Sequence, residues 1–337
     1  MQQSLVLKRI VWALLLCVGL VAAAAAYWVL RPLPLTAERI DIAIEPQTSV
    51  RGIANATVAS GVDVSEFLLH VFFRASGRSR GLRAGSYELV RGDSALDLLR
   101  KLTRGEENLR AVSLIDGWTL RQFRQALDKA DGLRHDTTGL SDAAIMQRLG
   151  LSDVAAEGRF FPDTYTYGKG SSDWRVLERA ARAMQRQLDR AWAQRATDLA
   201  LQTPEQALIL ASIVEKETGR ESDRAMIASV FHNRLRIGMP LQTDPTVIYG
   251  LGESFDGNLR RADLQRDHAW NTYTRRGLPP TPIAMPGRNA LLAAVQPARS
   301  QALYFVARGD GSSEFSATLE AHNAAVNRYQ RRHNSAP

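Results

Sequence analysis

The carboxylate of Glu217 continues the apolar side of a predicted helix that begins at Pro204. Steps of four residues connect Ile209, Ile213 and Glu217, and residues four apart lie on one face of a helix. Burial disfavours the charged form of a carboxylate, and the negative end of a helix dipole does the same, so both raise its pKa. A carboxyl group that keeps its proton near neutral pH can act as a general acid. The pattern predicts this role for Glu217, unless it is solvated in a fraying last turn beside Arg220.

The helix that carries this glutamate has a strong start signal. Thr203 is a preferred N-cap residue, Pro204 suits the first helical position, and Gln206 can complete a capping box. Glu215 points to a different side of the helix from Glu217. We therefore expect replacement of Glu215 by glutamine to have little effect, unless Glu215 orients a neighbour.

Residues 155–332 are predicted to form a mostly helical domain around this helix. Apolar residues recur at helical spacing through residues 172–199. A further helix is expected over residues 223–237, because Gly238 then provides a stop signal.

Residues 39–130 repeat a shorter pattern, in which a β-prone run is followed by a polar turn and an amphipathic helix. The runs begin near Ile40, Tyr87 and Val112, and a serine or threonine follows each where an N-cap is needed. The first two repeats are similar to a LysM-like module, a small α/β fold that binds N-acetylglucosamine-containing glycans. The third would be a following β/α unit. The alternative is a small domain that only spaces the rest of the body from a membrane.

An uncharged run over residues 10–30 has the length that crosses a bilayer as a helix. Lys8 and Arg9 precede it, so the N-terminal tail is expected in the cytoplasm and the rest outside. We therefore predict a cytoplasmic tail and transmembrane anchor over residues 1–30, in a single-pass protein of the inner membrane whose body lies in the periplasm. A cleaved signal peptide is the alternative, since residues 22–26 are small.

The next segment and the overall charge agree with this location. Prolines at positions 32 and 34 make residues 31–38 a short stiff linker. The formal charge of +8 becomes +6 outside the membrane once Lys8 and Arg9 are left in the cytoplasm. A basic body favours anionic partners, such as wall polymer or lipid headgroups. Nucleic acid is not expected, because the basic residues are scattered and export separates the protein from it.

Neither a metal site nor a cofactor is expected. The six histidines show no paired ligand spacing, and the single cysteine, Cys17, lies inside the apolar run.

Four blocks of sequence resemble MltG-type (YceG-like) endolytic murein transglycosylases. Residues 211–218 resemble the catalytic-helix motif of that family, whose second glutamate falls on Glu217. The other blocks are residues 157–165, 228–250 and 271–280. The stretch 241–250 is long and nearly identical to the family pattern, which makes chance a poor explanation.

This resemblance implies an α+β protein with an N-terminal transmembrane helix, a LysM-like small α/β module and a mostly helical, lytic transglycosylase-like catalytic domain. It implies a lyase that cuts MurNAc-GlcNAc bonds in nascent glycan strands, leaves 1,6-anhydroMurNAc ends and acts as a terminase of glycan elongation. Glu217 would protonate the glycosidic oxygen and then accept the proton of the muramic acid C6 hydroxyl. Peptidoglycan glycan strands, the inner membrane and peptidoglycan synthases are the expected partners.

A sugar cleft also needs amides, hydroxyls, carboxylates and flat rings. The candidate substrate-binding residues are Gln242, Asp244, Tyr249, Asn271, Tyr273, Glu157 and Tyr165. Each has a structural alternative. Asp244 can simply begin a turn before Pro245, and Tyr165 or Tyr249 can be a core residue with a satisfied hydroxyl.

Two other functions stay open. One is a muramidase, in which a second carboxylate such as Asp244 or Asp163 activates water. The other is a non-catalytic, glycan-binding scaffold of the wall-synthesis machinery. The mass of the glycan ends separates these cases, because an anhydro end is lighter than a hydrolysed end by one water.

Overall fold

The computed structural model describes residues 2–331, which divide into two compact units. Within this range the first unit contains residues 2–111, 131–134 and 166–171, and the second contains residues 112–130, 135–165 and 172–331. Residue 332, the expected end of the catalytic domain, lies outside the described residues, as does His333.

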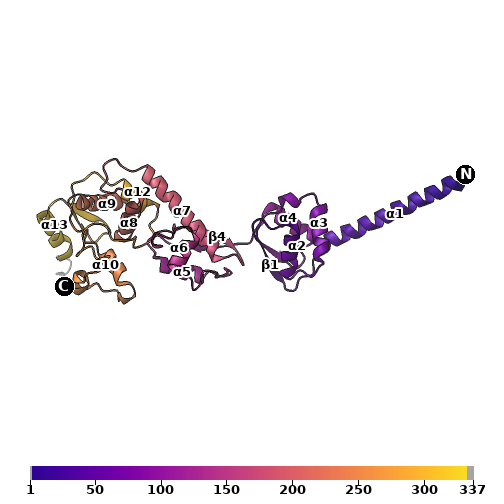
Figure 1. Ribbon diagram of the computed structural model, residues 1–337, viewed down its shortest axis with the longest axis horizontal. Helices are drawn as coiled ribbons and strands as arrows, with labels where there is room; N and C mark the ends of the chain where they lie inside the picture. Colours follow the sequence, from indigo (N-terminus) through magenta and orange to yellow (C-terminus); the bar gives the residue numbers. More distant parts are fainter. Residues whose placement is uncertain (1, 332–337) are drawn as a thin grey trace. The chain divides into compact units, whose positions relative to one another are not determined.

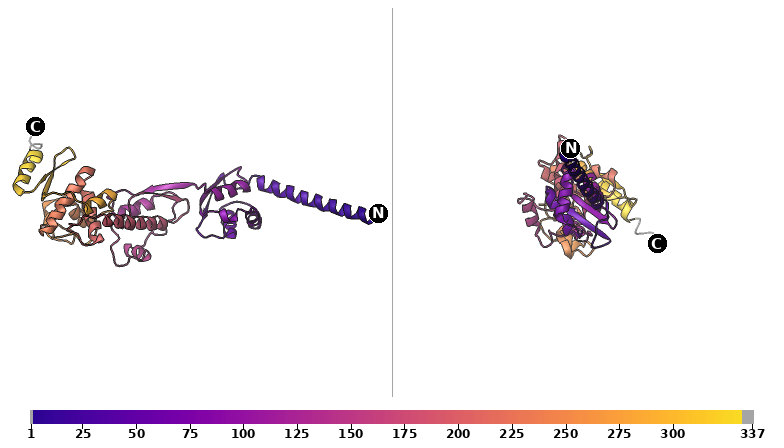
Figure 2. Two further views of the ribbon diagram at one scale, coloured as in Figure 1. Left: turned by 90° about the horizontal axis from the view of Figure 1, so that it is seen from above. Right: turned by 90° about the vertical axis from the view of Figure 1, so that its right-hand side faces the viewer.

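The first unit begins with the apolar helix. α1 (Gln2–Leu30) is one continuous helix, drawn in indigo (Figures 1 and 2). Its Val11–Leu30 part has the length and composition of a membrane-crossing helix, and its side chains are exposed within the chain except for Trp28 and Val29, which are partly buried. The predicted apolar helix over residues 10–30 is therefore present.

The rest of the first unit combines helices with a two-stranded sheet. The elements are β1 (Arg39–Ile44), α2 (Val50–Ala59), α3 (Glu66–Ala75), η1 (Ser79–Gly81), β2 (Gly85–Val90) and α4 (Ala95–Arg104). β1 and β2 are antiparallel, with Arg39 opposite Val90. Alternate side chains of β1 face the core, where Ile40, Ile42 and Ile44 are buried.

Local caps explain where two of these helices begin and end. Ser49 accepts a hydrogen bond from the backbone N–H of Gly52 at the start of α2. Ser94 and Asp97 form a reciprocal capping box at the start of α4, and Gly105 ends that helix in a left-handed conformation. The strand, turn and helix pattern does not predict α3, whose Leu69 and Phe73 complete the core.

The third predicted repeat is divided between the units. β3 (Leu109–Ser113) and β4 (Thr164–Gly168) form a two-stranded sheet, and each strand has residues in both units. α5 (Leu120–Asp128), which follows β3, belongs to the second unit. The division after residue 111 therefore falls inside the segment 39–130 that the sequence pattern groups together.

The second unit is mostly helical, as predicted. After α5 its elements are α6 (Asp142–Arg148), α7 (Asp173–Ala193), α8 (Pro204–Glu217), α9 (Glu221–Arg236), α10 (Asp244–Leu251), η2 (Gly252–Ser254), α11 (Arg261–Gln265), α12 (Arg288–Val295), β5 (Tyr304–Ala307), β6 (Ser313–Ser316), α13 (Leu319–Val326) and η3 (Asn327–Arg331). β5 and β6 pair antiparallel. Together with the sheets of β1 and β2 and of β3 and β4, these elements make a mixed helix and sheet protein.

α8 is the central helix of the second unit. Every residue from 207 to 214 is buried, and α7, α9, α10 and α12 pack around the helix (Figure 1). The sequence predicted an apolar stripe on one side of this helix. The structure shows that the helix is enclosed on every side, as is usual for a helix that is apolar all round, so the predicted stripe was too narrow. The first and last turns of α8 are less buried than this middle part, and Glu217 lies in the last turn.

The predicted helix boundaries in this unit are largely confirmed. Thr203 accepts from the backbone N–H of Gln206, with Pro204 in the first turn. The predicted capping box is wrong in one of its two bonds. The side chain of Gln206 accepts from the backbone N–H of Gln202 instead of that of Thr203. α7 ends at Ala193, earlier than the apolar rhythm indicated, whereas α9 closely matches its predicted range.

Candidate active site

Glu217 is the last residue of α8 and is partly buried. Its Oε2 atom accepts a hydrogen bond of 2.7 Å from the hydroxyl of Thr243. Burial raises the pKa of the Glu217 carboxyl and the nearby negative charge of Asp244 adds to this, whereas the Thr243 hydrogen bond and Arg234 oppose it. The net direction is upward, which favours a carboxyl group that holds its proton at higher pH than a free glutamate.

Thr243 is itself held by a cluster of buried threonines. Its backbone N–H donates to the hydroxyl of Thr272 at 3.1 Å, and its carbonyl accepts from the hydroxyl of Thr246 at 2.8 Å. The hydroxyls of Thr246 and Thr272 are 2.9 Å apart. This network fixes the backbone of Thr243, so its hydroxyl is positioned on Glu217 before any ligand arrives.

Sequence analysis did not single out Thr243. The available signal was its position inside the block 241–250, directly between Gln242 and Asp244. A threonine hydroxyl carries no charge, so residue type alone gave no reason to choose it.

Gln242 has a left-handed backbone conformation, with a φ angle of +49°. This region is uncommon for residues other than glycine and costs free energy on the order of 1 kcal/mol or more. Leu241 and Thr243, on either side, are both buried, so the chain turns sharply at this position and leaves the side chain of Gln242 exposed. The exposed amide is free to meet a ligand.

Asp244 and Tyr273 are brought together beside this turn. The hydroxyl of Tyr273 donates to Oδ1 of Asp244 at 2.5 Å. Burial and this hydrogen bond both raise the pKa of Tyr273. Asp244 is exposed at the start of α10, and its charge acts on Glu217, so a carboxylate, a phenol and the candidate acid lie in one neighbourhood.

Arg234 is a second residue that sequence analysis did not select. Its buried guanidinium donates to the carbonyls of Leu241 and Leu303, each at 2.7 Å, and lies over the ring of Tyr304. Arg234 therefore anchors the chain just before Gln242, and its positive charge acts on Glu217. The available signal was a basic residue three or four positions from the apolar residues Val230, Phe231 and Ile237.

Glu157 and Tyr249 form another pair. Glu157, which is 8% exposed, accepts from the backbone N–H of Leu120 at 3.0 Å and from the hydroxyl of Tyr249 at 3.2 Å. The Tyr249 ring packs edge-on against Trp270. Glu157 thus links the start of α5 to α10, and burial raises the pKa of its carboxyl to about 7.

This shift predicts a pH-dependent stability. The folded state binds the Glu157 proton more tightly than the unfolded chain, so its contribution to the free energy of unfolding is largest below pH 4.5 and is lost as the pH rises to about 7. Replacement of Glu157 by glutamine should remove this part of the slope. Denaturant titrations across that range measure it, and equal slopes for both proteins would contradict the assignment.

Tyr165 and Asn271 make their hydrogen bonds inside the protein. The hydroxyl of Tyr165 donates to the carbonyl of Phe161 at 2.7 Å. The side-chain amide of buried Asn271 donates to the carbonyl of Arg266 at 2.7 Å, and its oxygen accepts from the backbone N–H of Tyr273 at 2.9 Å. Asn271 therefore shapes the loop that presents Tyr273.

Glu215 faces a different environment from Glu217. Its side chain is 5% exposed, forms an ion pair with Arg224 at 3.0 Å and accepts from the backbone N–H of Gly287 at 2.9 Å. Burial raises the pKa of Glu215, against the lowering effects of those two partners. Glu215 points away from Glu217 and holds Arg224 and the backbone of Gly287, which is the condition under which its replacement was expected to have an effect.

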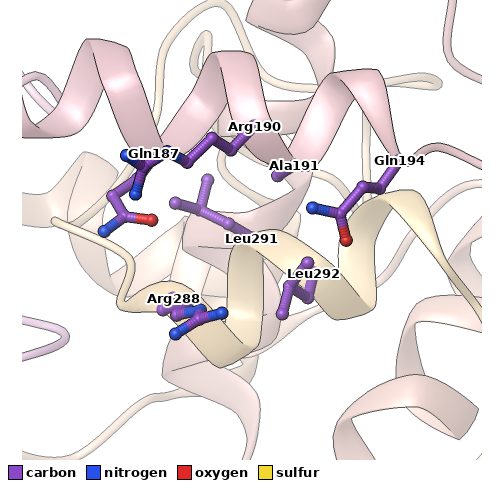
Figure 3. A pocket seen from close by; sticks show the side chains of 7 residues that line it. All are labelled: Gln187, Arg190, Ala191, Gln194, Arg288, Leu291 and Leu292. Carbon is purple, nitrogen blue, oxygen red and sulfur yellow. The ribbon is translucent and has the colours of Figure 1, made fainter.

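A small pocket elsewhere in the second unit is separate from these residues. Figure 3 shows it between α7 and α12, with Arg190 and Gln194 on one side and Arg288 and Leu292 on the other. Its volume of about 40 Å³ accommodates water rather than a sugar.

Comparisons with known proteins identify the family of this chain. A model of the YceG-like family matches residues 42–328. An endolytic murein transglycosylase of Bacillus subtilis strain 168 is 32% identical over 311 residues, which span 86% of this chain and 84% of the relative. An endolytic murein transglycosylase of Streptococcus pneumoniae strain D39 is 27% identical over 322 residues, 85% of this chain and 58% of that longer protein.

A solved structure gives the same result. The crystal structure of a putative YceG-like protein from Listeria monocytogenes is similar, with a TM-score of 0.53 and 29% identity, over 85% of this chain and 99% of that one. Because the family model covers most of the sequence and the Bacillus relative covers most of its own length, this chain belongs to the YceG-like family.

Proposed function

We propose that this protein is an endolytic peptidoglycan lytic transglycosylase, a lyase that cleaves MurNAc-GlcNAc bonds in nascent glycan strands. The observation that carries the proposal is Glu217, a carboxyl group with a raised pKa that Thr243 orients at the emerging end of a buried helix. The names of the relatives from Bacillus and Streptococcus support the same reaction and substrate.

In this mechanism one glutamate serves twice. Protonated Glu217 donates its proton to the glycosidic oxygen as the bond from that oxygen to C1 of MurNAc breaks. The C6 hydroxyl oxygen of the same MurNAc then bonds to C1, and its proton returns to Glu217. Because Thr243 donates to Oε2, Oε1 is the atom left to exchange the proton with the sugar. The product ends in 1,6-anhydroMurNAc, and water is not consumed.

Three of the candidate substrate-binding residues adjoin Glu217 in this proposal. Gln242 offers an exposed amide, and Asp244 and Tyr273 offer a hydrogen-bonded carboxylate and phenol. Glu157 and Tyr249 would contact sugar from the α5 and α10 side. Asn271 and Tyr165 would act through the loop and strand that they hold.

Product analysis tests the proposed reaction. Purified protein is incubated with wall sacculi, and the masses of the released glycan ends are measured. Anhydro ends are expected. Hydrolysed ends would instead identify a muramidase, for which Asp244 or Asp163 is the candidate second carboxylate, and the charge of Asp244 acts on Glu217. Absence of released fragments would indicate a scaffold.

Thr243 provides a prediction about the catalytic acid. Replacement by valine preserves shape but removes the hydroxyl that donates to Glu217. A hydrogen bond to a charged group contributes about 1.5–3 kcal/mol, so we expect a loss of about tenfold to a hundredfold in turnover.

The same change should move the pH profile. The Thr243 hydrogen bond lowers the pKa of Glu217, so its removal shifts the loss of acid catalysis to higher pH. Serine at position 243 restores the hydroxyl and should return both rate and profile towards normal. Equal rates for valine and threonine proteins, measured by release of anhydro ends, would exclude this role.

We also propose that α1 anchors the protein in the inner membrane with its body in the periplasm. The apolar composition of residues 11–30 and the basic residues before them support this orientation. A reporter fused to the C-terminus distinguishes the two sides. In this setting the enzyme would act beside peptidoglycan synthases as a terminase of glycan elongation.

The first unit is proposed to contain a LysM-like module that binds glycan. The order β1, α2, α3, β2, with antiparallel pairing of the strands, supports a small α/β module of this kind. Cosedimentation of the full-length Glu217→Gln protein with sacculi measures binding without cleavage. A protein that stays in solution at low salt would indicate that the module is only a spacer.

A further inference from the structure

α3 exposes an apolar surface that the core of the first unit does not use. Phe67, Leu68 and Val71 are 70%, 45% and 44% exposed, and together they form what we call the α3 face. The opposite side of the same helix buries Leu69 and Phe73. Residues at positions 67, 68 and 71 lie on one side of a helix, so the exposed apolar groups are contiguous. A contiguous exposed apolar patch is typical of a contact surface.

This face lies next to the end of the proposed membrane anchor. Trp28, near the C-terminal end of α1, packs edge-on against Phe72 of α3, with ring centroids 6.0 Å apart. α3 and the end of α1 are adjacent in Figure 1, and both belong to the first unit. Tyr27, on the preceding position of α1, is also exposed. Tryptophan and tyrosine at the end of an apolar helix are typical of the membrane interface.

A pocket with a basic rim adjoins α3. Its volume is about 470 Å³, and its apolar lining includes Phe72, Leu96 and Leu99. Ser76 and the arginines at positions 78, 100 and 104 complete the lining. Two of these arginines form exposed ion pairs, Arg100 with Asp97 and Arg104 with Glu106, and exposed pairs contribute little free energy, so a phosphate can compete for both guanidinium groups. Glu66, at the start of α3, pairs with Arg51.

We propose that the α3 face lies in the interfacial layer of the bilayer beside α1, and that the adjoining pocket binds an anionic phospholipid headgroup. The inference rests on the proposed anchoring of α1. The apolar floor fits the first carbons of a lipid, and the arginines fit its phosphate, because guanidinium groups bind phosphate oxygens in pairs. This second attachment would hold the first unit on the membrane surface at a point other than α1.

The test uses the full-length protein in lipid vesicles, with a fluorescent dye on single cysteines introduced at Phe67, Val71 or Glu107 in a Cys17→Ser background. Glu107 is the matched control, because it is exposed and lies against Gly85, at the end of the β1 and β2 pair remote from the linker. Spin-labelled lipid quenches dyes in the bilayer, and iodide quenches dyes in water. The vesicles contain either phosphatidylcholine alone or added phosphatidylglycerol.

We expect lipid quenching and iodide protection at positions 67 and 71, and the reverse at position 107. Iodide quenching at 67 and 71 equal to that at 107 would overturn the proposal. Protection from both quenchers would also overturn it, because a protein surface or a second copy would then cover the face.

A separate variant tests whether the pocket binds an anionic headgroup. Replacing Arg78, Arg100 and Arg104 by glutamine should weaken the binding of the α3 face and its pocket to phosphatidylglycerol vesicles. Each arginine near an anionic surface contributes about fivefold, so the loss should reach about a hundredfold for all three. Equal quenching in both lipids would exclude headgroup recognition. Flotation of the vesicles tests anchoring by α1 separately, and release of anhydro ends by the Cys17→Ser parent tests the proposed reaction.

Discussion

Replacing Glu217 by glutamine is expected to lower the release of anhydro-ended fragments by orders of magnitude while the fold is kept. Each of the two proton transfers assigned to this carboxyl contributes about 10²–10⁴-fold, and an amide can perform neither. The side chain keeps its size, and the amide can still accept the hydrogen bond from Thr243. Fragment release is measured by mass spectrometry, and folding by thermal unfolding of the same preparation.

The control for this variant is an exposed glutamate nearby. Glu221 lies at the start of α9 and contacts the side chain of Asn289, a bond that glutamine can also make. Glu221→Gln should therefore retain normal turnover. Near-normal turnover of Glu217→Gln would show that the acid is another group, with Glu157, Asp163 and Asp244 as the next candidates for a hydrolytic pair.

The pH profile of the unmodified enzyme follows from the same site. Cleavage needs the protonated form of Glu217, so turnover should fall as the pH rises through the pKa of that group. Burial and Asp244 raise this pKa, which extends acid catalysis to higher pH than a solvated glutamate would allow.

Features that depend on neighbouring residues in the chain were predictable from sequence. The caps at Ser94, Thr119 and Thr203, and the left-handed glycine at the end of α4, are local hydrogen-bonding patterns, and each appears in the structure. The range of α9 was predictable from its apolar spacing and from Gly238 after it, although no side-chain cap marks its start. α3 was missed, because half of its apolar residues face outward and blur the helical period.

The surroundings of the site could not be derived locally. Thr243 is 26 residues from Glu217, and Gly287 is 72 residues from Glu215. Helical periodicity placed the two glutamates on different sides, but it could not say what packs against each side. α8 is enclosed all round, so apolar neighbours alone did not separate a catalytic from a structural carboxylate. The distinction comes from a hydroxyl on one side and an arginine on the other.

Replacement of Glu215 by alanine is therefore expected to cause the largest loss in the free energy of unfolding. This change leaves Arg224, whose side chain is only 13% exposed, without its acidic partner, and it leaves the N–H of Gly287 without its acceptor. Breaking a buried ion pair from one side costs about 3–5 kcal/mol, so we expect a loss of this size in the free energy of unfolding. Calorimetry of the detergent-solubilised protein measures it.

Three further variants test that physical cause. Glutamine at position 215 can still accept from Gly287, so it should destabilise less than alanine. Adding Arg224→Ala to Glu215→Ala removes the stranded charge, and the double variant should lose less stability than the sum of the single variants. Glu106→Ala breaks the exposed pair with Arg104 and should cost at most about 1 kcal/mol. If Glu215→Ala costs no more than Glu106→Ala, the pair is not a structural anchor of α8. Any loss of turnover in the Glu215 variants would then point to chemistry rather than to the position of the helix end that carries Glu217.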